Sequence, residues 1–368
     1  FYYLGPVNGH DIAALESAIS WARDMRVPVL VHVLTKKGRG YPFAELHPDK
    51  YHGVGPFDLQ TGVIKSGVRT FSAEFGDTLC RIAEGNGRVM ALTAAMEDGT
   101  GLSRFAEKFP NRFFDSGIAE EHMVSMAAGM AKQGLVPVVA VYSTFLQRSY
   151  DQLIHDVSLL GLHVVFAVDR AGLVGEDGET HHGVFDVAYL STVPGMKVLC
   201  PASFAELREM LRSAVEDMDG PVAVRYPRGG EGRYRGCLAE RAALLREGTD
   251  VTLVAYGTMI NEALEAAEEL SGRGVSAEVI KLGQVCPIDT GIVYSSLKKT
   301  GRIVIAEEVC AAGSAGMNIL ACAAGKLKFA ARLLNLGSGI AQQGTTAELR
   351  AAAGIGAAGI VKAAMELM

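Results

Sequence analysis

The chain has 368 residues, of which 49% are hydrophobic and 21% charged, and its formal net charge is −6. At roughly 100–200 residues per domain this length predicts two or three domains, and the hydrophobic content excludes general disorder. The acidic balance argues against nucleic acid or an anionic membrane as a partner, because no overall basic surface is available. Apolar runs such as Val136–Tyr142 are too short for a transmembrane helix.

The six cysteines lie far apart in the sequence and form no CxxC pair. We interpret them as buried free thiols, which is typical of a reducing compartment and makes the cytoplasm the expected location. A zinc site and a disulfide framework are the disfavoured alternatives. The chain starts at Phe1 without the features of a targeting sequence, and we expect that an upstream segment is missing.

The first elements form a small α-β unit. Apolar residues at helical spacing predict a helix over Asp11–Met25, and the β-rich run Pro28–Thr35 predicts a strand. This unit is too small to be a domain and is typical of the last layer of a larger sheet. Tyr41–Lys65, rich in Pro and Gly with little periodicity, is predicted to be a linker.

Helices and strands alternate from Ser66 to Arg228. The predicted helices are Thr70–Ala83, Glu120–Lys132, Leu146–Leu160 and one opened by a capping box of Ser203 and Glu206. The predicted strands are Val89–Thr93, Phe113–Phe114, Val136–Tyr142, His163–Val168, Lys197–Cys200 and Val222–Tyr226. Such alternation indicates a parallel sheet covered by helices.

A second linker, Gly229–Gly248, is predicted to lead into a third alternating block. Its expected strands are Val251–Tyr256, Ala277–Leu282, Ile303–Glu307 and Ala331–Leu336, and a final helix is expected near Thr346–Met368. The sequence therefore predicts an α/β protein divided into residues 1–65, 66–230 and 231–368.

Polar residues follow four strands of the middle domain. Because the carboxyl ends of parallel strands meet at one edge of a sheet, these residues are expected to share one site. They combine carboxylates, histidines, an aromatic ring and arginines, which suits a phosphorylated small molecule, since arginine matches phosphate geometry. The residues are Asp115, Glu120, Tyr142, Phe145, Arg148, Asp169, Arg170, Asp177, His181, His182, Arg225 and Arg228. The third domain contains no histidine, and we expect no proton-transfer chemistry there.

Two patterns resemble binding motifs but are not interpreted as binding sites. The GxGxxG match at Gly354–Gly359 follows a helix-prone run instead of a strand, which argues against NAD binding. The pair His181 and His182 has no third ligand at a recognisable spacing, so a substrate-facing histidine beside a structural one is favoured over a metal site.

Several segments together resemble the 1-deoxy-D-xylulose-5-phosphate synthase family of transketolase-like enzymes. They are Ile118–His122, Tyr142–Gln152, Asp169–Gly172, Thr180–Asp186 and Tyr226–Gly229, with Leu4–Asp11 and Thr35–Tyr41 in the first unit. The resemblance implies a pyrimidine-binding domain and a largely structural C-terminal domain, preceded by the remnant of a diphosphate-binding domain. The GDG motif that would hold Mg²⁺ in the family does not occur in this sequence, so the magnesium ligands are expected in the missing segment.

The resemblance implies thiamine diphosphate as cofactor and assigns residues to it. Glu120 matches the acid that bonds the aminopyrimidine ring, and Phe145 matches the aromatic that packs on it, a plain core role for Phe145 being the alternative. Lys37 and His52 match residues near the cofactor.

Other residues match substrate positions in the family. The catalytic set is Glu120, His181 and Arg148, and the substrate-binding set is Tyr142, Arg148, Arg170, Asp177, His181 and Arg228. Arg170 and Arg228 match a phosphate clamp, the alternative being local pairs with carboxylates such as Asp169 or Glu231.

The implied reaction joins pyruvate and glyceraldehyde 3-phosphate into 1-deoxy-D-xylulose 5-phosphate and carbon dioxide, for isoprenoid and thiamine biosynthesis. The implied partners are the missing N-terminal domain, supplied by a separate chain if this chain is one half of a complex, and a second copy in a homodimer. Two alternatives stay open: a transketolase-like ketol transfer, and an inactive structural or dimerisation fragment.

Overall fold

The computed structural model describes residues 1–48, 50–64, 67–238 and 240–368. The chain divides into two compact units, Phe1–Gly67 and Val68–Met368.

The first unit holds a two-stranded parallel sheet, made of β1 (Tyr2–Asn8) and β2 (Val29–Leu34), with α1 (Ile12–Asp24) between them. The side chain of Asp11 caps α1 by accepting from the Ala14 amide. Helix α1 and strand β2 confirm the sequence prediction, whereas β1 was not predicted. The pairing of β1 is irregular between Leu4 and Val7, around Pro6, which breaks the strand pattern in the sequence.

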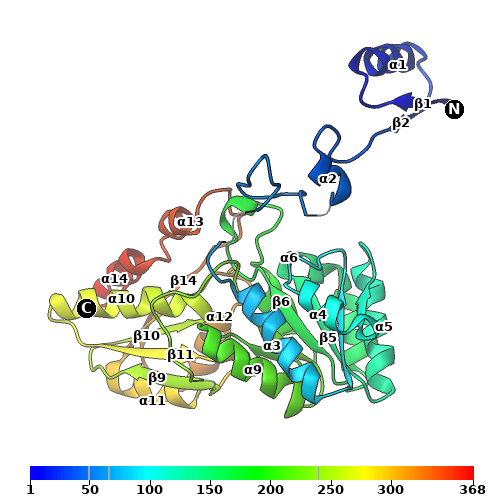
Figure 1. Cartoon of the computed structure of the whole chain (residues 1–368). Helices are drawn as coiled ribbons and strands as arrows, with labels where there is room; N and C mark the ends of the chain where they lie inside the picture. Colours follow the sequence, from blue (N-terminus) through cyan, green and yellow to red (C-terminus); the bar gives the residue numbers. More distant parts are fainter. Residues whose placement is uncertain (49, 65–66, 239) are drawn as a thin grey trace. The chain divides into compact units, whose positions relative to one another are not determined.

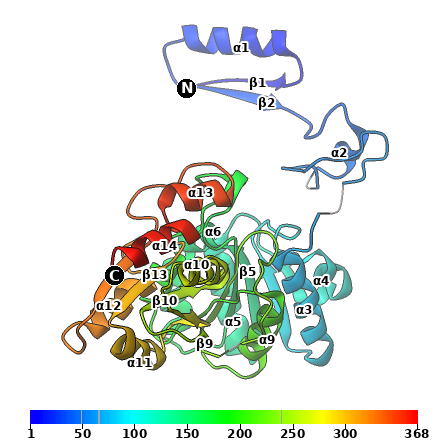
Figure 2. The ribbon, with the colours of Figure 1, turned by 90° about the vertical axis from the view of Figure 1, so that its left-hand side faces the viewer.

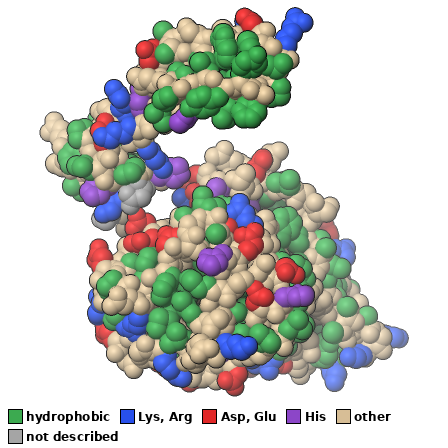
Figure 3. All heavy atoms as spheres, turned by 90° about the vertical axis from the view of Figure 1, so that its right-hand side faces the viewer, with side chains coloured by type: hydrophobic (Ala, Val, Ile, Leu, Met, Phe, Trp, Pro, Cys, Tyr) green, Lys and Arg blue, Asp and Glu red, His purple; other side chains and the backbone are tan. Residues whose placement is uncertain are grey.

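The predicted linker after β2 contains a short helix, α2 (Pro42–Leu46), and a small cluster of aromatic rings. The rings of Tyr41, Tyr51 and Phe57 lie 5.2–5.6 Å apart. Many hydrophobic side chains of the first unit are exposed, as Figure 3 shows, and these include Tyr2, Tyr3, Ile12, Ile19, Trp21, Leu30 and Leu34.

The second unit contains a central sheet with the strand order β12-β7-β8-β6-β5-β3-β4 in the described residues (Figure 1). Its strands are β3 (Val89–Thr93), β4 (Phe113–Asp115), β5 (Val136–Tyr142), β6 (Val165–Asp169), β7 (Lys197–Leu199), β8 (Val222–Arg225) and β12 (Gln284–Cys286). All neighbours are parallel except β12, which is antiparallel to β7. The predicted parallel α/β fold is confirmed.

Helices cover both faces of the central sheet (Figures 1 and 2). On one face, α3 (Phe71–Gly85) and α9 (Phe204–Glu216) share a core with the strands. On the other face, α5 (Glu120–Lys132) shares a second core with the strands and with part of the C-terminal domain. The remaining short helices of this part are α4 (Ser103–Lys108), η1 (Pro110–Arg112), η4 (Gly175–Asp177) and α8 (Asp186–Leu190).

Two predictions about helices need correction. The long helix predicted over Leu146–Leu160 begins earlier, at Ser143, and changes its hydrogen-bonding pattern from turn to turn through α6 (Ser143–Leu146), η2 (Gln147–Ser149), α7 (Tyr150–Gln152) and the π-helical η3 (Leu153–Ser158). The capping box of α9 is only half formed. Ser203 accepts from the Glu206 amide, but the Glu206 carboxylate accepts from Ala202 because it also binds Lys281 and Tyr234.

The C-terminal sheet has the order β14-β13-β10-β11-β9 in the described residues. Its strands are β9 (Ala242–Arg246), β10 (Val251–Tyr256), β11 (Ala277–Leu282), β13 (Arg302–Ala306) and β14 (Ala330–Leu334). Strand β9 falls in the predicted second linker, which is therefore wrong there. It is a half-buried antiparallel edge strand and lacks the continuous apolar run of the inner strands.

The helices of the C-terminal domain are η5 (Gly257–Met259), α10 (Ile260–Gly272), α11 (Gly291–Thr300), α12 (Ala315–Ala323), α13 (Thr346–Ala353) and α14 (Ala357–Met365). The single final helix of the prediction is thus two helices. Gly354 ends α13 with φ of +66°, a left-handed conformation that favours glycine. The GxGxxG pattern spans the junction between α13 and α14, so it follows a helix and not a strand.

Candidate active site

Glu120 is the first residue of α5, and the fold buries it there with 2% of its surface exposed. Its Oε1 lies 2.7 Å from Nη1 of Arg148, which comes from the helical turns after β5. The Arg148 side chain is about half exposed, so the pair joins a buried carboxylate to the surface of the site. No other hydrogen bond to the Glu120 carboxylate forms within the described part of the chain.

Two stacked aromatic rings extend the site from Arg148. Tyr142 and Phe145 stack with ring centroids 5.8 Å apart and an angle of 20°, and His181 meets Phe145 edge-on at 5.5 Å. The Arg148 guanidinium lies 5.0 Å from the centre of the Phe145 ring. Burial raises the pKa of Tyr142, so its phenol is protonated at neutral pH and is a hydrogen-bond donor.

Arg170 extends the site from the end of β6. Its backbone is left-handed, with φ of +56°, which is costly for a residue other than glycine and clusters at functional sites. Its guanidinium lies 4.0 Å above the Tyr142 ring, and its Nη1 contacts the Gly99 carbonyl at 2.5 Å and Asp169 Oδ2 at 3.1 Å. Its Nε is buried and has no partner among the described residues.

The loop after β3 closes tightly on these residues. A Cβ on Gly99 would lie 1.8 Å from the Tyr142 hydroxyl, so any larger residue there would displace the Tyr142 ring. Ser72, near the start of α3, donates to Asp169 Oδ2 at 2.7 Å. The loop, α3 and β6 therefore fix Arg170 together.

Arg228 follows β8, the strand next to β6 in the central sheet. Its Nε lies 3.1 Å from Asp177 Oδ2, and its Nη1 lies 3.3 Å from Glu176 Oε2. Arg170 and Arg228 line one cleft of about 560 Å³. The other residues that line it are Thr70, Ser72, Ala73, Asp98, Gly99, Gly101, Val174, Gly229 and Thr346.

The structure links most of the predicted site residues. Glu120, Arg148, Phe145, Tyr142, Arg170 and His181 form a continuous chain of contacts, and Asp177 and Arg228 form a pair at the cleft. The other two predicted site residues, Lys37 and His52, are exposed residues of the first unit.

Arg170 pairs with Asp169, the local ion pair that was the alternative to a phosphate clamp, and it also lines the cleft. Arg228 pairs with Asp177 and Glu176, whereas Glu231 pairs with Arg235 at 2.8 Å. His182 is buried and His181 is half-buried, in keeping with one structural histidine beside one that faces the site.

Sequence reasoning missed Ser72, Gly99 and Thr346 as parts of the cleft. Ser72 and Asp169 are 97 residues apart in the sequence, and no spacing links them. The cysteines are all free, but the prediction that they are buried holds fully only for Cys80 and Cys200, because Cys237 and Cys322 are exposed.

Three family models match the chain in succession. The model described as 1-deoxy-D-xylulose-5-phosphate synthase matches residues 1–35, the transketolase pyrimidine-binding domain matches 68–230, and the transketolase C-terminal domain matches 240–360. A solved structure titled "Split gene transketolase, inactive beta4 tetramer" is similar, with a TM-score of 0.72, 29% identity, and coverage of 81% of this chain and 98% of that chain. The transketolase from Leishmania mexicana, at 18% identity and a TM-score of 0.68, shares the fold over 82% of this chain and 46% of its own.

The fold and the site thus define a transketolase-like protein with a pyrimidine-binding domain and a C-terminal domain. Among curated proteins, the 1-deoxy-D-xylulose-5-phosphate synthase of Heliobacterium modesticaldum is 46% identical over 100% of the chain and 58% of its own length. Synthase 1 of Geobacter sulfurreducens is 46% identical over 99% of the chain and 59% of its own length. The chain belongs to the 1-deoxy-D-xylulose-5-phosphate synthase family and corresponds to the C-terminal portion of these relatives. It spans somewhat more than half of their length.

In the described residues, no helix combines the length and the apolar character that crossing a membrane would require.

Proposed function

We propose that the chain is the pyrimidine-binding and C-terminal part of a transferase that condenses pyruvate with glyceraldehyde 3-phosphate to 1-deoxy-D-xylulose 5-phosphate and carbon dioxide. The observation that carries the proposal is the shared cleft of Arg170 and Arg228, which is linked through the rings of Tyr142 and Phe145 to Arg148 and so to the buried carboxylate of Glu120. The phosphorylated substrate requires a phosphate-binding region, and a thiamine cofactor requires a buried acid. The proposed site offers both. The free thiols agree with a cytoplasmic location, which belongs to the same proposal.

The residues of this chain fit the aminopyrimidine part of thiamine diphosphate. Glu120 presents a buried carboxyl group whose Oε2 has no hydrogen bond in the described residues, and the Phe145 ring lies beside Arg148, the partner of Glu120. When bound, thiamine diphosphate would supply the electron sink that decarboxylation of pyruvate needs. Its diphosphate and Mg²⁺ would be held by the N-terminal domain, with Lys37 and His52 nearby.

Glu120 would bond a ring nitrogen of the pyrimidine and hold the proton there, while Arg148 keeps the carboxyl group in position. His181 and Tyr142 would bond the substrate oxygens, Tyr142 as a proton donor because its pKa is raised by burial. Arg170 and Arg228 would bind the phosphate of the acceptor, and Asp177 orients Arg228. A guanidinium matches the planar arrangement of phosphate oxygens and binds through two hydrogen bonds.

The test is formation of 1-deoxy-D-xylulose 5-phosphate by the chain mixed with the N-terminal domain of a relative, thiamine diphosphate and Mg²⁺. We expect activity from the mixture and none from the chain alone. Arg228→Ala should lower kcat/KM for glyceraldehyde 3-phosphate roughly 10- to 150-fold, the worth of one or two charged hydrogen bonds. With unphosphorylated D-glyceraldehyde, the wild type should be poor and the variant no worse. Equal losses with both acceptors would contradict the phosphate clamp.

A same-class rival, transketolase-like ketol transfer, takes a ketose phosphate donor in place of pyruvate. Replacing pyruvate by a ketose phosphate in the same mixture separates the two reactions. Turnover with the ketose alone would refute the proposed substrate pair.

A second candidate function is an inactive, assembly-forming part. It is favoured by the similar solved structure whose title describes an inactive β4 tetramer and of which this chain covers 98%. Thiamine diphosphate binding and oligomeric state, measured for the chain with and without the N-terminal domain, distinguish the two. A chain that forms a homodimer or larger assembly but never binds the cofactor or turns over in the mixture would favour this second function.

A further inference from the structure

The loop that carries Asp177 is held from two sides within the second unit. This substrate loop comprises residues 173–181 and includes η4. On one side Arg228 donates from Nη1 to the Val174 carbonyl at 3.3 Å and pairs with Asp177. On the other side lies the segment Gln342–Thr346 of the C-terminal domain.

His182 fastens the end of the substrate loop to this segment. It is 4% exposed, and the Val174 amide donates to its Nδ1 at 3.1 Å. Nδ1 is therefore an acceptor without a proton, so Nε2 carries the hydrogen and donates to the Gln342 carbonyl at 2.9 Å. The imidazole thus bridges the loop and the C-terminal domain through both of its nitrogens.

Gln343 and Thr346 add two more contacts. The Gln343 amide donates from Nε2 to the Glu176 carbonyl at 3.0 Å. Thr346 lines the same cleft as the two arginines, and a Cβ built on Gly175 would lie 3.4 Å from its hydroxyl oxygen. The C-terminal domain therefore supplies part of the cleft wall.

The supporting segment is itself well anchored. A complete capping box, formed by Thr345 and Glu348, starts α13 directly after it. Arg350 on α13 binds Glu262 Oε1 at 2.9 Å and also pairs with Glu308, so α13 is tied to α10 and to the end of β13. An anchored segment can set the position of the loop that rests on it.

We propose that the C-terminal domain controls affinity for the phosphorylated acceptor, with His182 and Gln343 as positioning residues for the substrate loop. The inference rests on the proposed function, because the ligand is the phosphate monoester that Arg170 and Arg228 would bind. Loss of either contact would shift Asp177, and Arg228 would follow because it is paired with that carboxylate. The C-terminal domain, which contains no histidine and is not expected to take part in proton transfer, would thus still contribute to substrate specificity.

The experiment titrates the full chain with sn-glycerol 3-phosphate, an unreactive phosphate monoester, by calorimetry. Gln343→Met keeps the length of the side chain but removes its donor, and should weaken binding about 3- to 10-fold, as one hydrogen bond is worth. His182→Leu should weaken it more, whereas His182→Gln, which keeps an acceptor and an amide donor, should stay near the wild type. Gln284→Met is the matched control, because Gln284 makes a similar bond to a backbone carbonyl, Pro287, at 2.9 Å outside the cleft.

Two further readouts separate positioning from general destabilisation. Hydrogen exchange in residues 174–181 should become several-fold faster in Gln343→Met and stay unchanged in Gln284→Met. In the reconstituted reaction, Gln343→Met should raise KM for glyceraldehyde 3-phosphate while kcat and KM for pyruvate stay within about twofold. Because Gln343 is exposed, this variant tests the inference even where His182→Leu does not fold.

The outcomes distinguish the two proposals. If Arg228→Ala weakens binding of sn-glycerol 3-phosphate but Gln343→Met does not, the inference is wrong and the phosphate clamp stands. If the wild-type chain does not bind this probe, or Arg228→Ala binds it equally well, the clamp is wrong and the inference fails with it.

Discussion

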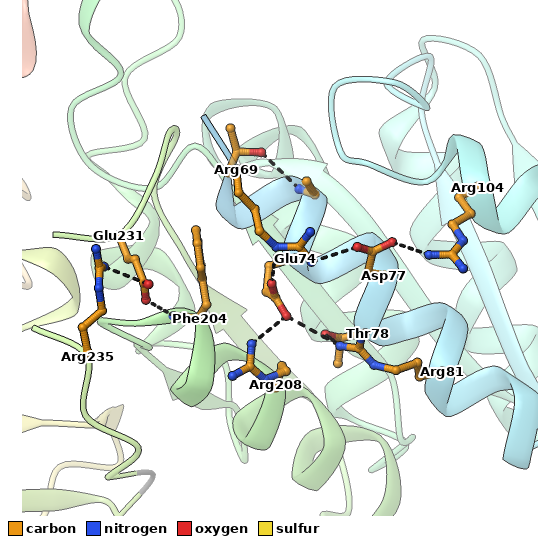
Figure 4. A network of polar contacts seen from close by, with 12 residues as sticks. Arg69, Glu74, Asp77, Thr78, Arg81, Arg104, Phe204, Arg208, Glu231 and Arg235 are labelled. Carbon is orange, nitrogen blue, oxygen red and sulfur yellow. Dashed lines mark hydrogen bonds and ion pairs between the residues drawn. The ribbon is translucent and has the colours of Figure 1, made fainter. Parts of the chain in front are cut away.

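Glu74 holds together a group of charged residues at the start of α3, and its replacement should cost more stability than that of any surface acid nearby. Figure 4 shows arginines from several segments converging on Glu74 and Asp77. Glu74 is 3% exposed and lies 2.6 Å from Arg69 Nε and 2.9 Å from Arg208 Nη1. Asp77 joins Arg69 to Arg104 at 2.8 and 2.7 Å.

Glu74→Gln should lower the free energy of unfolding by about 2–3 kcal/mol. The substitution removes two charge-assisted hydrogen bonds, each worth about 1.5–3 kcal/mol. Part of this loss is recovered, because the amide oxygen of Gln can still accept one weaker hydrogen bond and water can solvate the half-exposed arginines. For a unit of roughly 300 residues this corresponds to a fall in Tm of about 3–5 °C. The matched control is Glu216→Gln, which removes an exposed pair with Arg212 and should cost less than about 1 kcal/mol.

The effect should depend on pH with a definite sign. Burial favours the neutral form of Glu74, but hydrogen bonds from Arg208 and Arg69 outweigh burial and hold the pKa of Glu74 below its ordinary value. A lowered pKa stabilises the fold above the unfolded-state pKa of about 4.3, and this contribution is lost as the pH falls through the folded-state pKa. Urea unfolding at pH 7 and at pH 3.5 measures the difference between wild type and Glu74→Gln. A difference that is no larger than that of Glu216→Gln, or one that grows towards low pH, would refute the reasoning.

Three other predictions concern single residues. Glu120→Gln, assayed with the N-terminal domain present, should keep the fold and slow exchange of the cofactor C2 proton roughly 10²- to 10⁴-fold, and NMR exchange at the wild-type rate would contradict its assignment. Lys281→Met should cost about 3–5 kcal/mol in urea unfolding, because it leaves Glu206 charged in a fully buried pair, and adding Glu206→Gln should recover much of the loss. Burial raises the pKa of Cys200 to about 12, so iodoacetamide at pH 8 should label the exposed Cys237 first and leave Cys200 unmodified, as mass spectrometry would show.

The inner elements of the fold could be predicted because their sequence pattern coincides with their burial. The strands Val89–Thr93 and Val136–Tyr142 and the helix Glu120–Lys132 have the predicted bounds. Strands β1 and β9 could not be predicted in the same way. Strand β1 is interrupted at Pro6. Strand β9 is a short edge strand, and its pairing partner, β11, follows it in the sequence.

Site residues could be predicted from the sequence where they directly follow a strand and belong to a recognisable motif. Arg170 and Arg228 were placed at one sheet edge on this ground, and they do line one cleft. The left-handed backbone of Arg170 and its link to Ser72 depend on tertiary packing and leave no local pattern. Thr346 was missed for the same reason, because nothing in its own segment indicates that it lies beside the substrate loop.

Strand β12 limits how this protein can be recombined. It comes from the chain that builds the C-terminal sheet, directly after β11, yet it pairs with β7 at the edge of the central sheet. A chimera joined near residue 230 with a foreign C-terminal half would lose this strand and leave β7 with an unpaired edge, which promotes aggregation. An exchangeable module therefore has to keep Gln284–Cys286 with the pyrimidine-binding half, although more than 50 residues of the other half come before it in the sequence.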